Sequence, residues 1–418
     1  MLRSGHVVVL CAFTLLVLGV VMVNSAGMRV QPLGVDGVQT DGITLESILL
    51  SRPTGFMVAS LVVMAIASRM PVGWLSDLPK RLLGDKPPAV SIVVLWLGAA
   101  VIAGGLMSVY VPGIGKTVNG SARWVELPGA GFSFQPSEIA KWSLPVLLAV
   151  FVTLRGPRIA GLASGMLPAL IAIGLVAGVV VLEDLGTGVL ITAAAGVTLI
   201  AGGARLWQLG LIAPIGIAAV GASILSSDYR VRRITAFLDP FEDPKGDGYH
   251  MLQSMFAIAG GEGTGRGLGF GLQKFGYLPE DQTDFLFAVV CEELGIAGAA
   301  VVVGLFAALL LAGLSIVRNE PRRVIKIAGV GVLATVGFQA LINLLVVTGL
   351  GPTKGIALPL MSQGGTGWML TALMLGLLVA ADREQADMQL DDQPTNGDLH
   401  DEDDADARDP VGLYGQPA

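Results

Sequence analysis

Apolar residues fall into long runs along the chain, separated by shorter polar stretches. A helix of about 20 mostly apolar residues spans the hydrocarbon core of a bilayer. The pattern therefore predicts about ten transmembrane helices, and the fold class that we expect is an all-α polytopic membrane protein. The predicted helices occupy residues 5–23, 55–69, 89–110, 139–154, 159–182, 187–203, 206–225, 284–317, 325–350 and 365–382.

Composition supports this class. Of the 418 residues, 53% are hydrophobic and only 14% are charged, and the mean hydropathy is +0.71. A soluble domain usually carries about 25% charged residues. These values exclude an ordinary soluble enzyme and a disordered protein.

The net charge of −7 arises in the C-terminal segment. Residues 382–418 carry 12 acids and two bases, which leaves 21 acids and 24 bases, a net charge of +3, in the rest of the chain. Segments rich in Asp, Gly and Pro with few apolar residues cannot bury a core. We divide the chain into a transmembrane domain, residues 1–384, and an acidic, disordered cytoplasmic tail, residues 385–418.

Lysine and arginine predict the orientation, because short cytoplasmic loops carry an excess of both. With the N-terminus inside, most bases of the short loops fall on the inner side, and the outer loop 351–364 holds only Lys354. Both termini are predicted to be cytoplasmic. The small residues 25–27 would suit signal cleavage, but the first apolar run is long for a signal peptide, so we favour an uncleaved helix.

The largest segment between predicted helices is 226–283, between the seventh and the eighth. It has 58 residues, 14 of them charged, and several aromatic side chains. A loop of this length is usually functional or disordered, and the aromatic content favours order. We expect it on the extracytoplasmic face, with a short interfacial helix at 250–259.

Two features bear on the chemistry of the chain. The two cysteines, Cys11 and Cys291, lie in apolar runs and the three histidines are far apart, so a disulfide framework or a zinc site is not indicated. Glycine recurs at every second position from 261 to 271. This spacing predicts a flexible or tightly turning backbone or, alternatively, a backbone that closely approaches a ligand.

Charged residues at membrane depth are expensive and often functional. Glu138 and Lys141 are spaced i,i+3 at the start of a predicted helix. They form either a self-neutralising pair or a cationic centre for an anionic lipid headgroup. Asp184 lies between two apolar runs, where it caps the next helix or belongs to a site.

Acidic residues also precede the eighth predicted helix. Glu280, Asp281 and Asp284 lie just before it, where Thr283 or Asp284 could cap the helix or the carboxylates could belong to a site. Glu292 and Glu293 lie about two turns deeper, where capping cannot explain them. The polar stretch 351–366 re-enters the membrane as a broken segment. Such backbone is tolerated only where protein buries it or where it lines a cavity.

At these residues the sequence resembles the SEDS (shape, elongation, division and sporulation) family. The resemblance extends over about 380 residues, from the first predicted helix to the tenth. The stretches that carry it are SARWVELPGAGFSFQPSEIAK (121–141), DLGTG (184–188), FLDPFEDPKGDGYHMLQS (237–254), GLGFGLQKFGYLPEDQTDFLFAVVCEELG (267–295) and GPTKGIALPLMSQGG (351–365).

The resemblance implies a peptidoglycan glycosyltransferase that polymerises lipid II at the outer face of the cytoplasmic (inner) membrane. Asp284 matches the aspartate that the family requires and is expected to act as the general base. The positions expected to bind substrate or to orient the site are Arg123, Glu138, Lys141, Asp184, Glu280, Lys354 and Ser362. No cofactor is certain, although Mg²⁺ or Mn²⁺ would suit the substrate diphosphate.

The family also implies partners. We expect a class B penicillin-binding protein, which is a transpeptidase, to bind at the outer loop and the eighth and ninth helices. Other proteins of the division machinery are further expected partners, and a nucleic acid is not.

Two features qualify the resemblance. QKFGYLPE and PTKG are similar to the FtsW branch, which acts in division, and GYH is similar to the RodA branch, which acts in elongation. Gln282 replaces a usual histidine, Glu183 a usual proline and Gln363 a usual tyrosine. The alternatives are an elongation polymerase, a lipid II flippase, or a non-catalytic scaffold for the transpeptidase.

Overall fold

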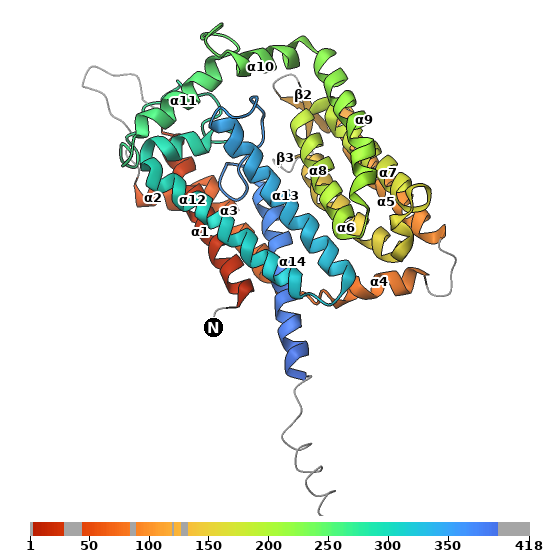
Figure 1. Ribbon diagram of the computed structural model, residues 1–418. Coiled ribbons are helices and arrows are strands. Elements are labelled where there is room, and N and C mark those ends of the chain that lie inside the picture. Colours follow the sequence, from red (N-terminus) through yellow and green to blue (C-terminus); the bar gives the residue numbers. More distant parts are fainter. Residues whose placement is uncertain (1–2, 29–43, 84–88, 119–120, 127–132, 392–418) are drawn as a thin grey trace, which may run out of the picture.

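The computed structural model describes residues 3–28, 44–83, 89–118, 121–126 and 133–391. Long helices dominate it (Figure 1). Each of the ten apolar runs is occupied by a helix: α1 (Ser4–Ala26), α3 (Arg52–Ala67), α5 (Ala89–Met107), α6 (Pro136–Arg155), α7 (Leu167–Glu183), α8 (Leu185–Ala201), α9 (Leu206–Leu225), α12 (Leu286–Asn319), α13 (Arg323–Val347) and α14 (Thr366–Asp391). The all-α class is confirmed.

Membrane insertion follows from length and apolar character. Seven helices in the described part of the chain are long and apolar enough to cross a bilayer, and α3 and α8 are shorter apolar helices. The chain is therefore a multi-pass membrane protein. The count of ten spans stays a prediction.

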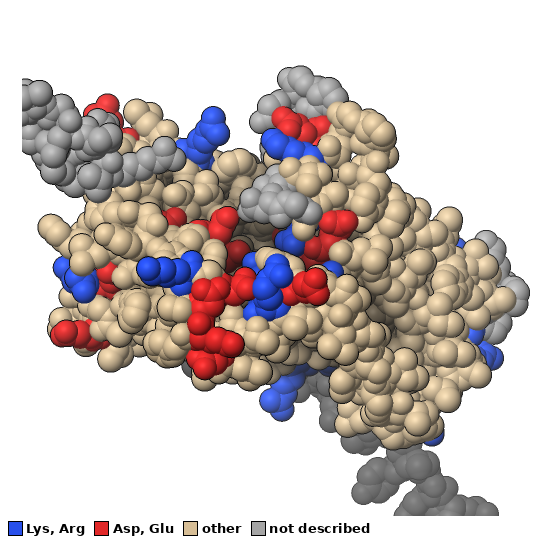
Figure 2. Space-filling model, turned by 90° about the horizontal axis from the view of Figure 1, so that it is seen from above, with Lys and Arg blue, Asp and Glu red and all other residues tan. Residues whose placement is uncertain are grey.

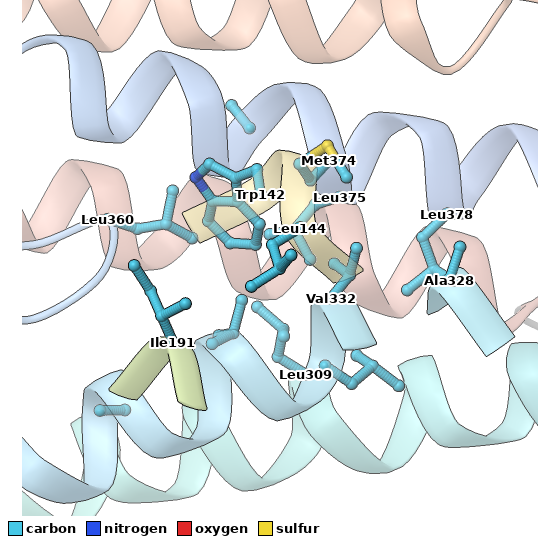
Figure 3. Close-up of a cluster of buried hydrophobic side chains, with 14 of the residues drawn as sticks. Trp142, Leu144, Ile191, Leu309, Ala328, Val332, Leu360, Met374, Leu375 and Leu378 are labelled. Atoms are coloured by element: carbon cyan, nitrogen blue, oxygen red, sulfur yellow. The ribbon is translucent and has the colours of Figure 1, made fainter. Parts of the chain in front are cut away.

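The membrane helices pack around a shared apolar core. α14 lies against α3, α1 against α12, and α13 against α6 and α8. Figure 3 shows side chains of several helices meeting there, among them Trp142, Ile191, Leu309 and Val332. Close approach depends on small residues, because a Cβ at Gly331 of α13 would lie 2.6 Å from Pro145 of α6.

Shorter elements cover the two ends of the bundle. At one end lie α10 (Asp228–Leu238), α11 (Tyr249–Gly261) and an antiparallel sheet of β1 (Gly115–Val118), β2 (Ser121–Glu126) and β3 (Ser133–Phe134) (Figure 1). α11 confirms the helix expected at 250–259. The opposite end carries the start of α1, the end of α14 and α4 (Gly73–Leu83). The remaining elements are α2 (Leu45–Leu49) and the helical turns η1 (Ser108–Tyr110), η2 (Gly156–Ala160) and η3 (Leu162–Met166).

The glycine-rich segment packs tightly on α12. α12 bends at Gly295, whose φ is 64°, and Gly265, with a φ of 78°, lies against this bend. A Cβ at Gly265 would lie 2.3 Å from the Glu293 carbonyl oxygen. At Gly261 and Gly265 the tightly turning backbone is confirmed, because a Cβ at Gly261 would also lie 1.9 Å from a carbonyl oxygen of α12, that of Cys291.

The boundary expected at residue 385 falls inside α14, which continues to Asp391. Gln385 is buried, and its amide donates to the Ile316 carbonyl at 3.2 Å and to Glu320 Oε2 at 2.7 Å. The first residues of the expected tail are thus helical and attached to α12. Residues 392–418 of that tail lie outside the described residues.

Candidate functional site

A polar cavity of about 860 Å³ opens beneath α10 and α11. Figure 2 shows a hollow in this face of the molecule, with acidic and basic side chains around it. Its wall comes from β2, α6, the α7–α8 junction, α10, α11, the residues before α12, α13, the re-entrant segment before α14 and the first turns of α14. All eight residues expected at the site line this cavity: Arg123, Glu138, Lys141, Asp184, Glu280, Asp284, Lys354 and Ser362.

Asp284 precedes α12 and does not cap it. The helix begins after Phe285 and has no side-chain cap, and the Asp284 carboxylate has no hydrogen-bond partner within the described ranges. A Cβ at Gly355 would lie 3.0 Å from Asp284 Oδ2, so the carboxylate rests against the re-entrant segment beside Lys354. Of the two interpretations, capping is wrong for Asp284.

The surroundings of Asp284 favour its protonated form. Burial, followed by the nearby carboxylates of Glu280 and Asp184, raises the pKa of Asp284 to about 7, although Arg233 and Arg123 act in the opposite direction. Removing a carboxylate from water and placing it near other negative charges both penalise its ionised form. A carboxyl group with a pKa near neutrality exchanges protons readily at neutral pH, as a general base requires.

Asp184 contacts two residues, Thr187 and Arg123. It caps α8, because its carboxylate accepts from the Thr187 backbone N–H at 3.1 Å and from Thr187 Oγ1 at 2.9 Å. It also pairs with Arg123 of β2, with 3.4 Å between Nη1 and Oδ2. The carboxylate therefore holds a guanidinium on the cavity wall.

Glu138 and Lys141 form the expected pair. Lys141 is 1% exposed, and its ammonium donates to both oxygens of Glu138 at 2.8 Å and to Gln339 Oε1 of α13 at 2.7 Å. An ammonium has three donors, and all three are used. Lys141 is therefore suited to holding α6 and α13 together at the cavity, whereas a free cation must come from another residue.

Lys354 provides such a cation. Its ammonium makes no hydrogen bond or ion pair within the described ranges, and it faces the cavity. Burial, with the nearby Arg233, lowers the pKa of Lys354 despite the opposing effect of Asp184. An unpaired, partly desolvated ammonium of this kind favours an anionic ligand.

Ser362 and Glu280 shape the segments that carry these groups. Ser362 Oγ accepts from the Leu358 N–H at 3.0 Å, and Trp368 Nε1 donates to the Ser362 carbonyl at 2.6 Å, which closes the re-entrant turn. Glu280 has a φ of 57°, rare for a residue with a side chain. Its carboxylate accepts from Thr283 Oγ1 at 2.8 Å. Both residues are placed to hold local conformation.

Among the charged and polar cavity residues that the sequence did not indicate are Arg230 and Arg233 of α10, His250 of α11 and Gln339 of α13. Arg233 stacks on the Tyr229 ring at 4.6 Å and donates to the Thr353 carbonyl at 3.0 Å. The closely spaced arginines of a short amphipathic helix were the available signal for α10. Gln339 lies within an apolar run, and its sequence context gave no signal of a role in the site.

Glu292 and Glu293 do not line the cavity. Glu293 and Lys274 form a fully buried ion pair of 2.8 Å that also binds Ser25 of α1. Glu292 accepts from the backbone N–H groups of residues 272 and 273. These carboxylates fasten the glycine-rich segment to α12, so their depth in the membrane has a structural explanation.

The described ranges contain no group of three or more His, Cys, Asp or Glu side chains that would hold a metal ion. The cavity is lined by both carboxylates and cations.

The fold and the cavity define a class: a multi-pass membrane protein with a charged cavity at one end of its helices, beneath a helical cap. A family model for FtsW, RodA and SpoVE, described as "Cell cycle protein", matches residues 6–387. The chain belongs to this family, as the resemblance indicated.

Proteins related in sequence align with most of the chain. A protein of Marinobacter nauticus named "Probable peptidoglycan glycosyltransferase FtsW" is 35% identical over 395 residues, which are 92% of this chain and 91% of that protein. "Stage V sporulation protein E" of Bacillus subtilis is 38% identical over 280 residues, 66% of this chain and 76% of that one.

Solved structures share the fold. A chain from a structure described as "Structural coordination of polymerization and crosslinking by a peptidoglycan synthase complex" has a TM-score of 0.65 and 26% identity, covering 90% of this chain and 97% of that one. The rod shape determining protein RodA of Thermus thermophilus has a TM-score of 0.54 and 22% identity, covering 90% and 96%. The second likeness concerns the fold alone.

Proposed function

We propose that this protein is a peptidoglycan glycosyltransferase that polymerises lipid II into glycan strands for septal wall synthesis during cell division. The observation that carries the proposal is Asp284, a carboxylate without a hydrogen-bond partner in the described ranges, in a cavity lined by cations. The names of the relatives support the same chemistry, and several relatives are named FtsW. This favours division over elongation.

The proposed reaction needs one base and a site for a leaving diphosphate. The C4 hydroxyl of one lipid-linked disaccharide attacks the anomeric carbon of another glycan. The bond from that carbon to the phosphate oxygen breaks, and a β-1,4 bond forms. Asp284 accepts the hydroxyl proton, and the polyprenyl diphosphate leaves with the bonding electrons.

Three cations are placed to bind the diphosphate: Arg123, Arg233 and Lys354, all of which line the cavity. Fixed positive charges stabilise the negative charge that grows on a leaving group. Lys141 is committed to Glu138 and Gln339, so we assign it the role of orienting the site. Mg²⁺ or Mn²⁺ is proposed only as a counter-ion that the diphosphate brings with it, and no step depends on it.

We place the cavity on the extracytoplasmic side of the inner membrane and both termini in the cytoplasm. This assignment rests on the distribution of Lys and Arg, and the start of α1 and the end of α14 lie at the end of the bundle opposite α10 and α11 (Figure 1). Apolar grooves between helices would hold the polyprenyl tails.

We further propose a class B penicillin-binding protein as partner. Its expected surface comprises the outer segment 226–283, α12 and α13. The outer segment exposes large apolar side chains that suit a protein contact, including Leu268, Phe270 and Tyr277, which are 43%, 73% and 57% exposed. Other division proteins remain proposed partners.

The test is polymerisation of lipid II in detergent, where there is no bilayer across which a lipid could be translocated. Purified protein is incubated with lipid II, with and without the partner transpeptidase, and glycan chains are resolved on a gel. Glycan chains are expected. If lipid II stays unpolymerised with the partner present, the proposal fails in favour of a flippase or a scaffold, and Gln282→His becomes the first reversion to examine.

A further inference from the structure

Glu183 joins three elements at the rim of the cavity. Its Oε1 accepts from the Tyr110 hydroxyl at 2.7 Å, at the end of η1, and its Oε2 accepts from the Ala122 backbone N–H of β2 at 2.9 Å. Glu183 is itself the last residue of α7. One carboxylate thus fastens the sheet and η1 to a membrane helix.

The bond to β2 lies next to the Arg123–Asp184 pair. Glu183 contacts Ala122. Asp184, which follows Glu183, contacts Arg123, which follows Ala122. Two adjacent residues at the α7–α8 junction therefore hold two adjacent residues of β2. The register of β2 on the helix end decides where the Arg123 guanidinium lies.

The sheet and the ion pair provide little support of their own. The strands have four, six and two residues, and a sheet of this size is marginal unless it packs on another element. The Arg123–Asp184 contact is a single one of 3.4 Å, long for a charge-assisted hydrogen bond. Arg123 is also 33% exposed along its side chain, so its position depends on the strand.

We propose that Glu183 is a positioning residue that clamps β2 to the end of α7 and so fixes Arg123 on the cavity wall. This inference rests on the proposed function, because it assigns Arg123 a fixed position towards the substrate diphosphate. The diphosphate is already anionic in the bound substrate, so a displaced Arg123 weakens binding of the ground state and of the transition state alike, while Arg233 and Lys354 remain for the charge that grows on the leaving group. The loss is expected in KM, with kcat little changed.

Variants of Glu183 and Tyr110 distinguish the effect of the two hydrogen bonds from the effect of the negative charge. Glu183→Ala removes both bonds, and Tyr110→Phe removes one. Glu183→Gln removes the charge but retains both contacts, because its amide oxygen accepts from the Ala122 N–H and its NH₂ donates to the tyrosine oxygen. Glu126→Gln is the matched control, an acid of the same strand whose exposed ion pair with Lys116 lies away from the cavity.

Two readouts are needed, hydrogen exchange of residues 115–126 and polymerisation kinetics of the full-length protein with lipid II and the transpeptidase. For Glu183→Ala we expect faster exchange and a KM raised about tenfold with kcat within about twofold. Tyr110→Phe should be intermediate, and Glu183→Gln should restore most of the wild-type behaviour.

Other results would contradict specific parts of this proposal. Unchanged exchange in Glu183→Ala would contradict the clamp. If Glu183→Gln raised hydrogen exchange and KM as much as Glu183→Ala, the charge of Glu183, rather than its two hydrogen bonds, would position β2. If the wild type makes no polymer, exchange still tests the clamp, so failure of the proposed function is distinguishable from failure of this inference.

Discussion

Asn343 of α13 holds the backbone of Asp284: its side-chain amide donates to the Asp284 carbonyl at 2.7 Å. The same amide donates to the Ile356 carbonyl at 2.8 Å. Asn343 is 1% exposed. One buried side chain therefore fixes the proposed base and the re-entrant segment relative to each other.

Asn343→Ala should impair both folding and catalysis. Loss of the amide leaves two buried carbonyls unpaired, which costs about 1–3 kcal/mol each, and lets Asp284 shift. A misplacement of about 1 Å can cost on the order of 100-fold in rate. Kinetics and thermal unfolding in detergent would be compared with Thr335→Val, which removes only a hydrogen bond inside α13. Equal kcat in the two variants would refute the positioning role.

The pKa of Asp284 predicts the pH dependence of the rate. A base must be deprotonated, so kcat/KM should rise with pH through about 7, the pKa of Asp284. Glu280 and Arg233 displace this pKa in opposite directions. Glu280→Gln should therefore move the midpoint to lower pH and Arg233→Gln to higher pH, as measured by pH–rate profiles. Shifts of the same sign would contradict the electrostatic account.

The Asp284 carboxylate should also lower the stability of the folded protein at neutral and higher pH. Its folded pKa of about 7 lies above the ordinary aspartate value of 3.8, so ionisation above neutral pH penalises the folded state. The penalty is absent below the lower pKa and complete above the higher one. Asp284→Asn should have a higher Tm than wild type at pH 8, with a smaller difference at pH 5. A lower Tm at pH 8 would indicate a structural role for the carboxylate.

The buried Lys274–Glu293 pair should dominate the stability of the glycine-rich segment. Lys274→Met leaves Glu293 buried and unpaired, which typically costs about 3–5 kcal/mol, and adding Glu293→Gln should recover part of the loss. Lys116→Met is the control, since it breaks a pair whose side chains are 52% and 46% exposed. Such exposed pairs contribute about 0–1 kcal/mol. Similar unfolding temperatures for Lys274→Met and Lys116→Met would contradict this view.

Hydropathy was sufficient for the helices, because each run of apolar residues in lipid has one stable conformation, and the described helices follow the predicted runs closely. The family motifs located the eight cavity residues. Arg233 and Gln339 could not be found in this way, since their roles arise from tertiary contacts with Thr353 and Lys141. For Glu293 the sequence showed an unexplained acid, but its partner Lys274 lies 19 positions away and was not foreseen.

The central claim is that Asp284 is the general base. Asp281 offers a matched control, because it lies three positions earlier, its pKa is also raised, to about 6, chiefly by burial, and it does not line the cavity. The decisive measurement compares lipid II polymerisation by wild type, Asp284→Asn and Asp281→Asn, each purified with the transpeptidase. The account predicts glycan chains from wild type and Asp281→Asn and none from Asp284→Asn. Polymer from a correctly folded Asp284→Asn would contradict it.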